Sequence, residues 1–99
     1  MIKFEKLDSL LGYMLIDESN RTLYVDVDSM PHLSQALRRS ISGRSRKERR
    51  NYAGTILVEN SNDNVTIRDT DKYAHWSVFV SMNNTTAEEL ADLIDRFMD

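Results

Sequence analysis

The sequence contains no cysteine, one proline, three glycines and no long hydrophobic run. Without cysteine the chain cannot form disulfides, use a thiolate nucleophile or build a zinc–cysteine site. The longest apolar stretch, residues 13–16, is far shorter than the ~20 residues that a membrane-spanning helix needs. Residues 1–6 lack the apolar core of a secretion signal. We therefore expect a soluble cytoplasmic protein with no membrane partner.

Catalytic signatures are equally scarce. The three glycines are isolated, so the chain has no glycine-rich phosphate loop and no Gly-x-Ser-x-Gly motif. The two histidines, His32 and His75, do not stand in a metal-ligand spacing. With 99 residues and 40% hydrophobic side chains, residues 1–99 are expected to form one domain with one core. These features favour a non-catalytic protein without a cofactor over an enzyme.

Four segments alternate apolar and polar residues, which predicts half-buried β-strands. They are residues 22–28, 55–59, 64–68 and 75–82. The last is the longest and is rich in β-branched and aromatic residues, so we expect it at the centre of a sheet. Residues 13–17 fit a further strand, and the first residues fit either a strand or a helix, of which we favour the strand. The short connections favour antiparallel pairing.

Two segments have apolar residues at helical spacing. The first, residues 29–42, begins at Ser29 as a cap residue and has Pro31 in its first turn. The second, residues 86–98, follows a possible capping box formed by Thr85 with Glu88 or by Thr86 with Glu89. The predicted fold is α+β: an antiparallel β-sheet of about five or six strands with two α-helices (about 29–42 and 86–98) packed on it.

The charge is very unevenly distributed along the chain. Between Arg38 and Arg50, seven basic residues stand against the single acid Glu48, a net charge of +6. The remaining residues carry six basic and fifteen acidic side chains, a net charge of −9. Residues 42–51 have no apolar side chain, so we expect them to form a basic loop or a helix extension. Such a concentration of charge bears on partners rather than on fold.

The basic segment has the chemistry of an anion-binding site, because the planar guanidinium of arginine suits phosphate and carboxylate oxygens. We expect nucleic acid, RNA or DNA, as the partner, with Tyr52 as a stacking platform. The expected main contacts are Arg44, Arg46, Arg49 and Arg50, assisted by Lys47, Arg38 and Arg39. The alternative is an inhibitor or immunity-type protein whose basic segment enters an acidic cleft of a partner enzyme. The same charges also fit a solvated loop or pairing within the chain.

Two other groups of residues in the sequence could form a site or a patch. Asp26, Asp28 and His32 could together form a metal or acid–base site, or Asp28 or Ser29 could simply cap a helix. Tyr24, Leu57 and Phe79 each interrupt the polar side of a predicted strand. Clustered, these three side chains would make a docking patch; otherwise the sheet is covered on both sides.

Overall fold

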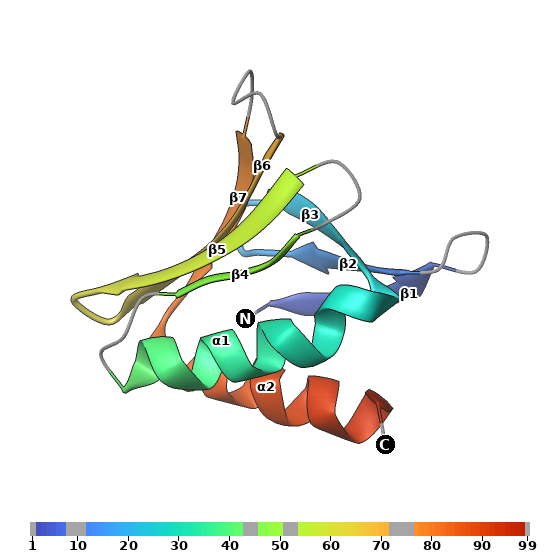
Figure 1. Ribbon diagram of the computed structural model, residues 1–99. Helices are drawn as coiled ribbons and strands as arrows, with labels where there is room; N and C mark the ends of the chain where they lie inside the picture. The colour runs from blue at the N-terminus through green and yellow to red at the C-terminus, as the bar shows by residue number, and fades with distance from the viewer. Residues whose placement is uncertain (1, 8–11, 43–45, 51–53, 72–76, 99) are drawn as a thin grey trace.

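The computed structural model describes residues 2–7, 12–42, 46–50, 54–71 and 77–98 (Figure 1). Within these ranges the chain forms seven β-strands, one short 3₁₀-helix and two α-helices. Their bounds are β1 Lys3–Leu7, β2 Gly12–Ile16, β3 Thr22–Asp26, η1 Val27–Ser29, α1 Met30–Ile41, β4 Arg46–Arg50, β5 Gly54–Ser61, β6 Asn64–Asp71, β7 Ser77–Met82 and α2 Asn84–Met98.

The strands form two antiparallel sheets, each in chain order: β1-β2-β3 and β4-β5-β6-β7. The helices α1 and α2 lie against each other and against one face of the four-stranded sheet (Figure 1). This arrangement confirms the expected α+β class with two helices. In the described part of the chain, neither helix is both long and apolar enough to cross a membrane.

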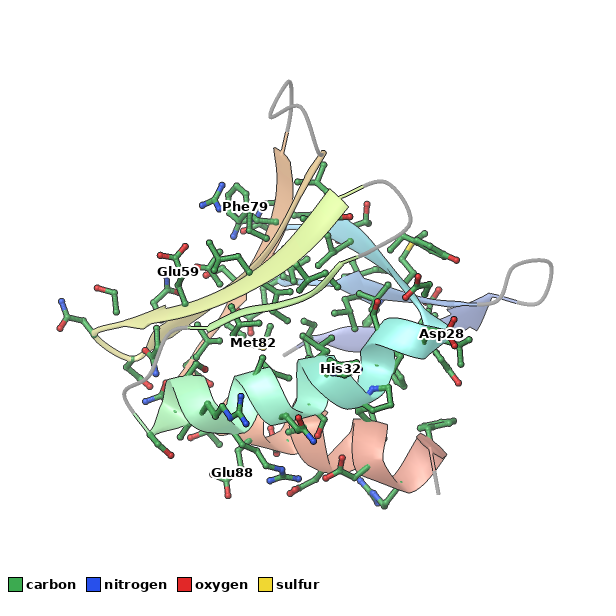
Figure 2. All side chains as sticks on the ribbon, in the orientation of Figure 1. Asp28, His32, Glu59, Phe79, Met82 and Glu88 are labelled. Carbon is green, nitrogen blue, oxygen red and sulfur yellow. The ribbon has the colours of Figure 1, made fainter. Side chains whose placement is uncertain are left out.

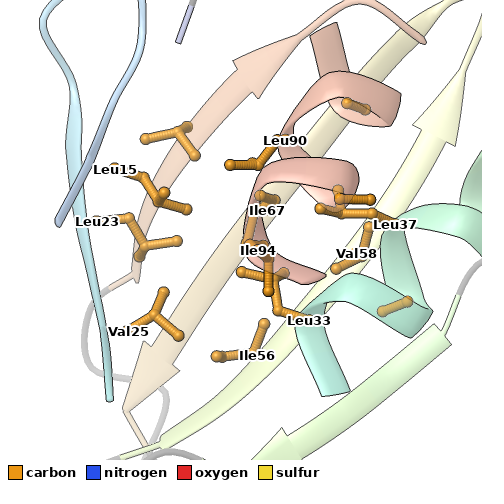
Figure 3. Close-up of a cluster of buried hydrophobic side chains, with 14 of the residues drawn as sticks. Leu15, Leu23, Val25, Leu33, Leu37, Ile56, Val58, Ile67, Leu90 and Ile94 are labelled. Atoms are coloured by element: carbon orange, nitrogen blue, oxygen red, sulfur yellow. The ribbon is translucent and has the colours of Figure 1, made fainter. Parts of the chain in front are cut away.

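The core lies where the two helices meet both sheets (Figure 3). Alternation along the strands supplies it: on β3, Leu23 and Val25 are buried whereas Thr22 and Tyr24 are exposed. The fully buried side chains include Leu15, Leu23 and Val25 from the three-stranded sheet, Ile56, Val58 and Ile67 from the four-stranded sheet, and Leu33, Leu37, Leu90 and Ile94 from the helices. The face of the four-stranded sheet that points away from these helices is called the outer face below.

Polar residues set the ends of the elements. The β5–β6 hairpin turns at Asn62 and Asp63, whose φ angles of 49° and 64° are the positive values that a type I′ turn requires. Helix α2 begins at Asn84, two residues before the expected start. Its cap is Asn83, whose side chain accepts a hydrogen bond from the Thr86 N–H at 2.8 Å. The expected capping boxes are therefore wrong, because a cap at Asn83 places both threonines inside the helix.

The strand expected at the centre of a sheet, β7, is instead an edge strand. One of its outward N–H groups, that of Ser81, donates to the Asp17 carboxylate at 3.0 Å, and β3 lies beside it. Its apolar alternation comes from Val80 and Met82, which are buried beneath the helices. An edge strand can therefore have the strong apolar alternation of a central strand. This requires that its inner face is fully covered and that a side chain accepts a hydrogen bond from its unpaired backbone N–H.

Candidate functional site

The basic segment does not form the expected loop or helix extension across residues 46–50. These residues form β4, the edge strand of the four-stranded sheet. Pairing with β5 gives the backbone of β4 its hydrogen-bond partners, and this pairing does not require apolar side chains. Charged residues are typical of edge strands because they discourage pairing with other chains. The expectation failed because it was based on side-chain polarity, whereas the strand is formed by backbone pairing with an apolar neighbour.

The register of β4 carries an irregularity typical of a β-bulge. Arg46 lies opposite Val58 and Lys47 opposite Leu57, but Arg50 lies opposite Thr55. Three steps along β4 thus correspond to two steps along β5, so β4 has one extra residue. Directly opposed residues in an antiparallel pair belong to the same face. Positions 47 and 50 therefore both belong to the outer face. In a regular strand, two positions three residues apart would belong to opposite faces.

The other expected contacts have different outcomes. Arg44 and Tyr52 lie outside the described residues. Arg39 lies on α1 and is half-buried. Arg38, in the last turn of α1, pairs with two acids of α2: its Nη2 atom is 2.9 Å from Asp92 Oδ1 and 2.5 Å from Asp95 Oδ2. For Arg38, the structure thus shows the pairing within the chain that the sequence left as one alternative.

These contacts shift the pKa values of Arg38 and Asp95. Hydrogen bonds to Asp95 and then Asp92 raise the pKa of Arg38. Hydrogen bonds from Ser34 and then Arg38 hold the pKa of Asp95 below its ordinary value, against an opposing effect of burial. All three charged side chains remain substantially exposed, so solvent screens these pairs. Arg38 therefore joins the two helices, and the two carboxylates beside it offset its attraction for a phosphate.

Replacing Arg38 with Ala tests this role. Exposed ion pairs contribute about 0.2–1 kcal/mol each, so the variant should unfold at slightly lower urea concentration in low salt. Salt screening should shrink the difference from the wild type at about 1 M NaCl. Nucleic-acid affinity should change by less than that of an Arg68→Ala variant. A stability loss that is the same at both salt concentrations would contradict the ion-pair role.

The outer face also has basic residues beyond β4. The register aligns Lys47, Leu57, Arg68 and Phe79 in one cross-strand row. Phe79 and Glu59 point away from the helices whereas Met82 points toward them (Figure 2). Leu57 and Phe79 thus share this face with Arg68 between them, whereas Tyr24 belongs to the other sheet. The expected patch of three apolar residues becomes a row in which apolar and basic residues alternate.

Phe79 is flanked by two arginines. The guanidinium carbon of Arg21 lies 4.4 Å from the centre of the Phe79 ring, and that of Arg68 lies 5.1 Å away. Both distances are within the range of cation–π attraction. Sequence reasoning missed Arg21, because it lies in the β2–β3 connection, far from Phe79 along the chain. The one available signal was that Phe79 interrupts the polar side of its strand.

A buried carboxylate holds Arg21 in place. The Asp17 side chain is 2% exposed and its Oδ2 atom accepts from Arg21 Nε at 2.8 Å. It also accepts from the backbone N–H groups of Ser19, Arg21 and Ser81 at 2.9–3.0 Å. Burial raises the pKa of Asp17, but the hydrogen bonds from the Arg21 and Ser81 backbone, the Arg21 side chain and Ser19 outweigh it, so the pKa lies below its ordinary value. Asp17 is therefore an ionised anchor beneath the Arg21–Phe79 pair.

Asp26, Asp28 and His32 do not form a site of the kind considered from the sequence. Asp26 accepts a hydrogen bond from the Ser29 N–H at 2.9 Å and so caps η1. Asp28 and His32 are exposed (Figure 2). No group of three or more metal-ligating side chains able to hold an ion occurs among the described residues. The capping side chain is therefore that of Asp26, rather than that of Asp28 or Ser29 as the sequence suggested, and Ser29 holds the N-cap position of α1 without a side-chain cap hydrogen bond. The structure gives no support to a metal or acid–base site there.

Comparisons with protein-family models, curated proteins and solved structures found no match to this chain. Its function therefore has to be inferred from the chemistry of the outer face.

Proposed function

We propose that this chain is a small non-catalytic cytoplasmic protein that binds nucleic acid through the outer face of its four-stranded sheet. The observation that carries the proposal is the register of β4, which places positions Lys47 and Arg50 on the same face as Arg68 and the Arg21–Phe79 pair. The cations of β4 are Arg46, Lys47, Arg49 and Arg50. A sheet face with several arginines and a partly exposed aromatic ring combines phosphate attraction with a surface on which bases stack.

The edge position of β4 also has a purely structural explanation, because charges protect an edge from aggregation. That explanation accounts for β4 alone. It does not account for Arg68 and Arg21, which lie beyond β5 and gather around Phe79. Lys47 and Arg68 stand in one cross-strand row that ends at Phe79, where Arg21 adds a third charge, and this arrangement favours a ligand that is itself extended and anionic.

A titration of labelled RNA and DNA, single-stranded and duplex, tests the proposal at 50 and 200 mM salt. Fluorescence anisotropy should show binding that weakens with salt, since each phosphate contact contributes about −0.7 to the slope of log K against log salt for single strands. Binding that is absent at low salt, or unchanged at the higher salt, would contradict it. Recovery of the protein with one stoichiometric protein and no nucleic acid would support the inhibitor or immunity-type alternative.

Glu59 supplies a test with the opposite sign. It is exposed on the outer face and its charge repels phosphate. At a separation of about 10 Å in water the repulsion is about 0.4 kcal/mol, so Glu59→Gln should raise the affinity for nucleic acid about twofold at low salt. The matched control is Glu88→Gln on α2, on the opposite side of the molecule, which should leave the affinity unchanged. Equal gains from both variants would indicate an effect of net charge rather than of this face.

A further inference from the structure

The structure has an open hollow beside the Arg21–Phe79 pair. It measures about 390 Å³ and is lined by Asn20, Arg21, Thr22, Val78 and Phe79. Three of these residues come from the β2–β3 connection and the start of β3, and two come from β7, so the hollow lies where the two sheets meet. A volume of this order is at the lower end of the range of small-ligand sites.

The lining is apolar on one side and polar on the other. Val78, which is 40% exposed, and Phe79 contribute the apolar part of the lining. Asn20 and Thr22 are exposed polar residues, and the Arg21 side chain is 41% exposed. A planar, partly apolar ligand with an attached anion matches this combination, because its flat face can stack while its charge meets the guanidinium. A nucleotide has both parts.

Arg21 is prearranged for such contacts. Asp17 binds the Nε atom of its guanidinium, while the guanidinium carbon stays over the Phe79 ring. A guanidinium has five N–H donors, and in the described part of the chain the Asp17 bond occupies the one on Nε. The terminal amino groups therefore remain as donors for a phosphate. An arginine already held in its binding conformation loses less side-chain entropy when a ligand arrives.

We propose that this hollow binds one nucleotide of a single strand, with the base against Phe79 and Val78 and the phosphate at Arg21. This inference rests on the proposed function and adds a strand preference to it. Bases in a duplex are already stacked and paired, so only an unpaired base can enter the hollow. With β4 about 14 Å away across three strand spacings, the rest of the strand runs over the outer face toward the β4 cations.

The test measures the affinity of four probes by fluorescence anisotropy: an RNA and a DNA single strand of about 8 nucleotides, a duplex of the same sequence, and an abasic strand of the same length. Wild-type protein should bind the single strands about 5- to 100-fold more tightly than the abasic strand, the range for stacking one base. Comparison of the RNA and DNA strands shows which of the two the hollow accepts. Equal affinity for the abasic and complete strands would overturn the inference.

Two substitutions locate the effect. Phe79→Leu removes the ring but keeps an apolar side chain, and Arg21→Lys keeps the charge but removes the planar guanidinium. Each should lower single-strand affinity about 5- to 10-fold while leaving duplex affinity and its salt slope within twofold of the wild type. The matched control is Phe97→Leu, which removes an aromatic ring that is 54% exposed on α2 and packs against Phe4 and Tyr13. It should change neither affinity.

The outcomes separate this inference from the proposed function. If the wild type binds the duplex with strong salt dependence but Phe79→Leu leaves single-strand affinity unchanged, the nucleotide site is wrong and the proposed function stands. If Phe79→Leu, with an unchanged circular dichroism spectrum, lowers single-strand and duplex affinity equally, base stacking is also excluded. If the wild type binds none of the probes at low salt, both proposals fail together.

Discussion

Nucleic-acid binding should become weaker and less dependent on salt when Lys47 and Arg50, the two β4 cations at outer-face positions, are replaced with Thr. Threonine is β-branched and polar, so it keeps the strand propensity of the edge while removing the charges. If each of these two cations contacts one phosphate, the slope of log K against log salt should fall by about 1.4 for a single strand. Across a fourfold change in salt concentration, that slope corresponds to a difference of about 7-fold in affinity.

The measurement is a titration of one labelled single strand at 50, 100 and 200 mM salt with the variant and the wild type. A double variant, Lys3→Thr with Arg96→Thr, removes two exposed cations from β1 and α2 and controls for net charge. It should leave the slope unchanged, since those residues lie away from the outer face. A slope that falls equally per charge in both variants would show that the position of the β4 cations does not matter.

Replacing Asp17 with Ala should destabilise the protein by about 3 kcal/mol. The variant loses four hydrogen bonds to an ionised acceptor and leaves the N–H groups of Arg21 and Ser81 short of a partner. For a domain of this size, such a change lowers the Tm by about 12–24 °C, which thermal unfolding followed by circular dichroism can measure. Glu89→Ala on α2, exposed at the surface, is the control and should change stability by less than about 0.5 kcal/mol.

The Asp17 contribution also has a defined pH dependence. Because the pKa of Asp17 is lower in the folded protein than in the unfolded chain, its stabilising effect is fully present at pH values above the unfolded pKa of about 4. It is lost as the pH falls below that value and through the folded pKa. The stability difference between wild type and Asp17→Ala should therefore narrow on acidification below about pH 4. A difference that stays constant down to pH 2 would contradict the role of the ionised carboxylate.

Much of the fold follows from side-chain periodicity. Leu23 and Val25 alternate with Thr22 and Tyr24 and are buried as alternation requires. The helical stripes at residues 30–41 and 84–98 likewise become the faces that contact the core. These patterns can be recognised in the sequence because the side chains that face the core are apolar, and they recur with the period of the strand or helix.

Periodicity could not reveal β4, because a strand made entirely of charged residues gives no apolar signal. Its pairing depends on the edge that β5 offers, which is a property of the assembled sheet. The position of β7 at an edge was hidden for a similar reason, since its free Ser81 N–H is satisfied by Asp17 from a distant part of the chain. Side-chain patterns report burial, whereas neighbours in a sheet depend on backbone partners.

The candidate site shows the same division. The basic residues at 46–50 were identified from charge alone, and the alignment of Arg68 with Phe79 required the register. Arg21 became visible only in three dimensions, because it approaches Phe79 through a connection between strands of the other sheet. A face assembled from two sheets in this way leaves no motif with fixed spacing.

The most direct test of nucleic-acid binding at the outer face is a titration of ¹⁵N-labelled protein with an unlabelled single strand, followed residue by residue in ¹H–¹⁵N NMR spectra. The account predicts the largest amide shifts in β4, at the outer-face positions of β6 and β7 that include Arg68 and Phe79, and at residues 20–22. Helix α2 should shift little. Shifts confined to the helices or to β1, or spectra that do not change at a saturating concentration of the strand in low salt, would contradict it.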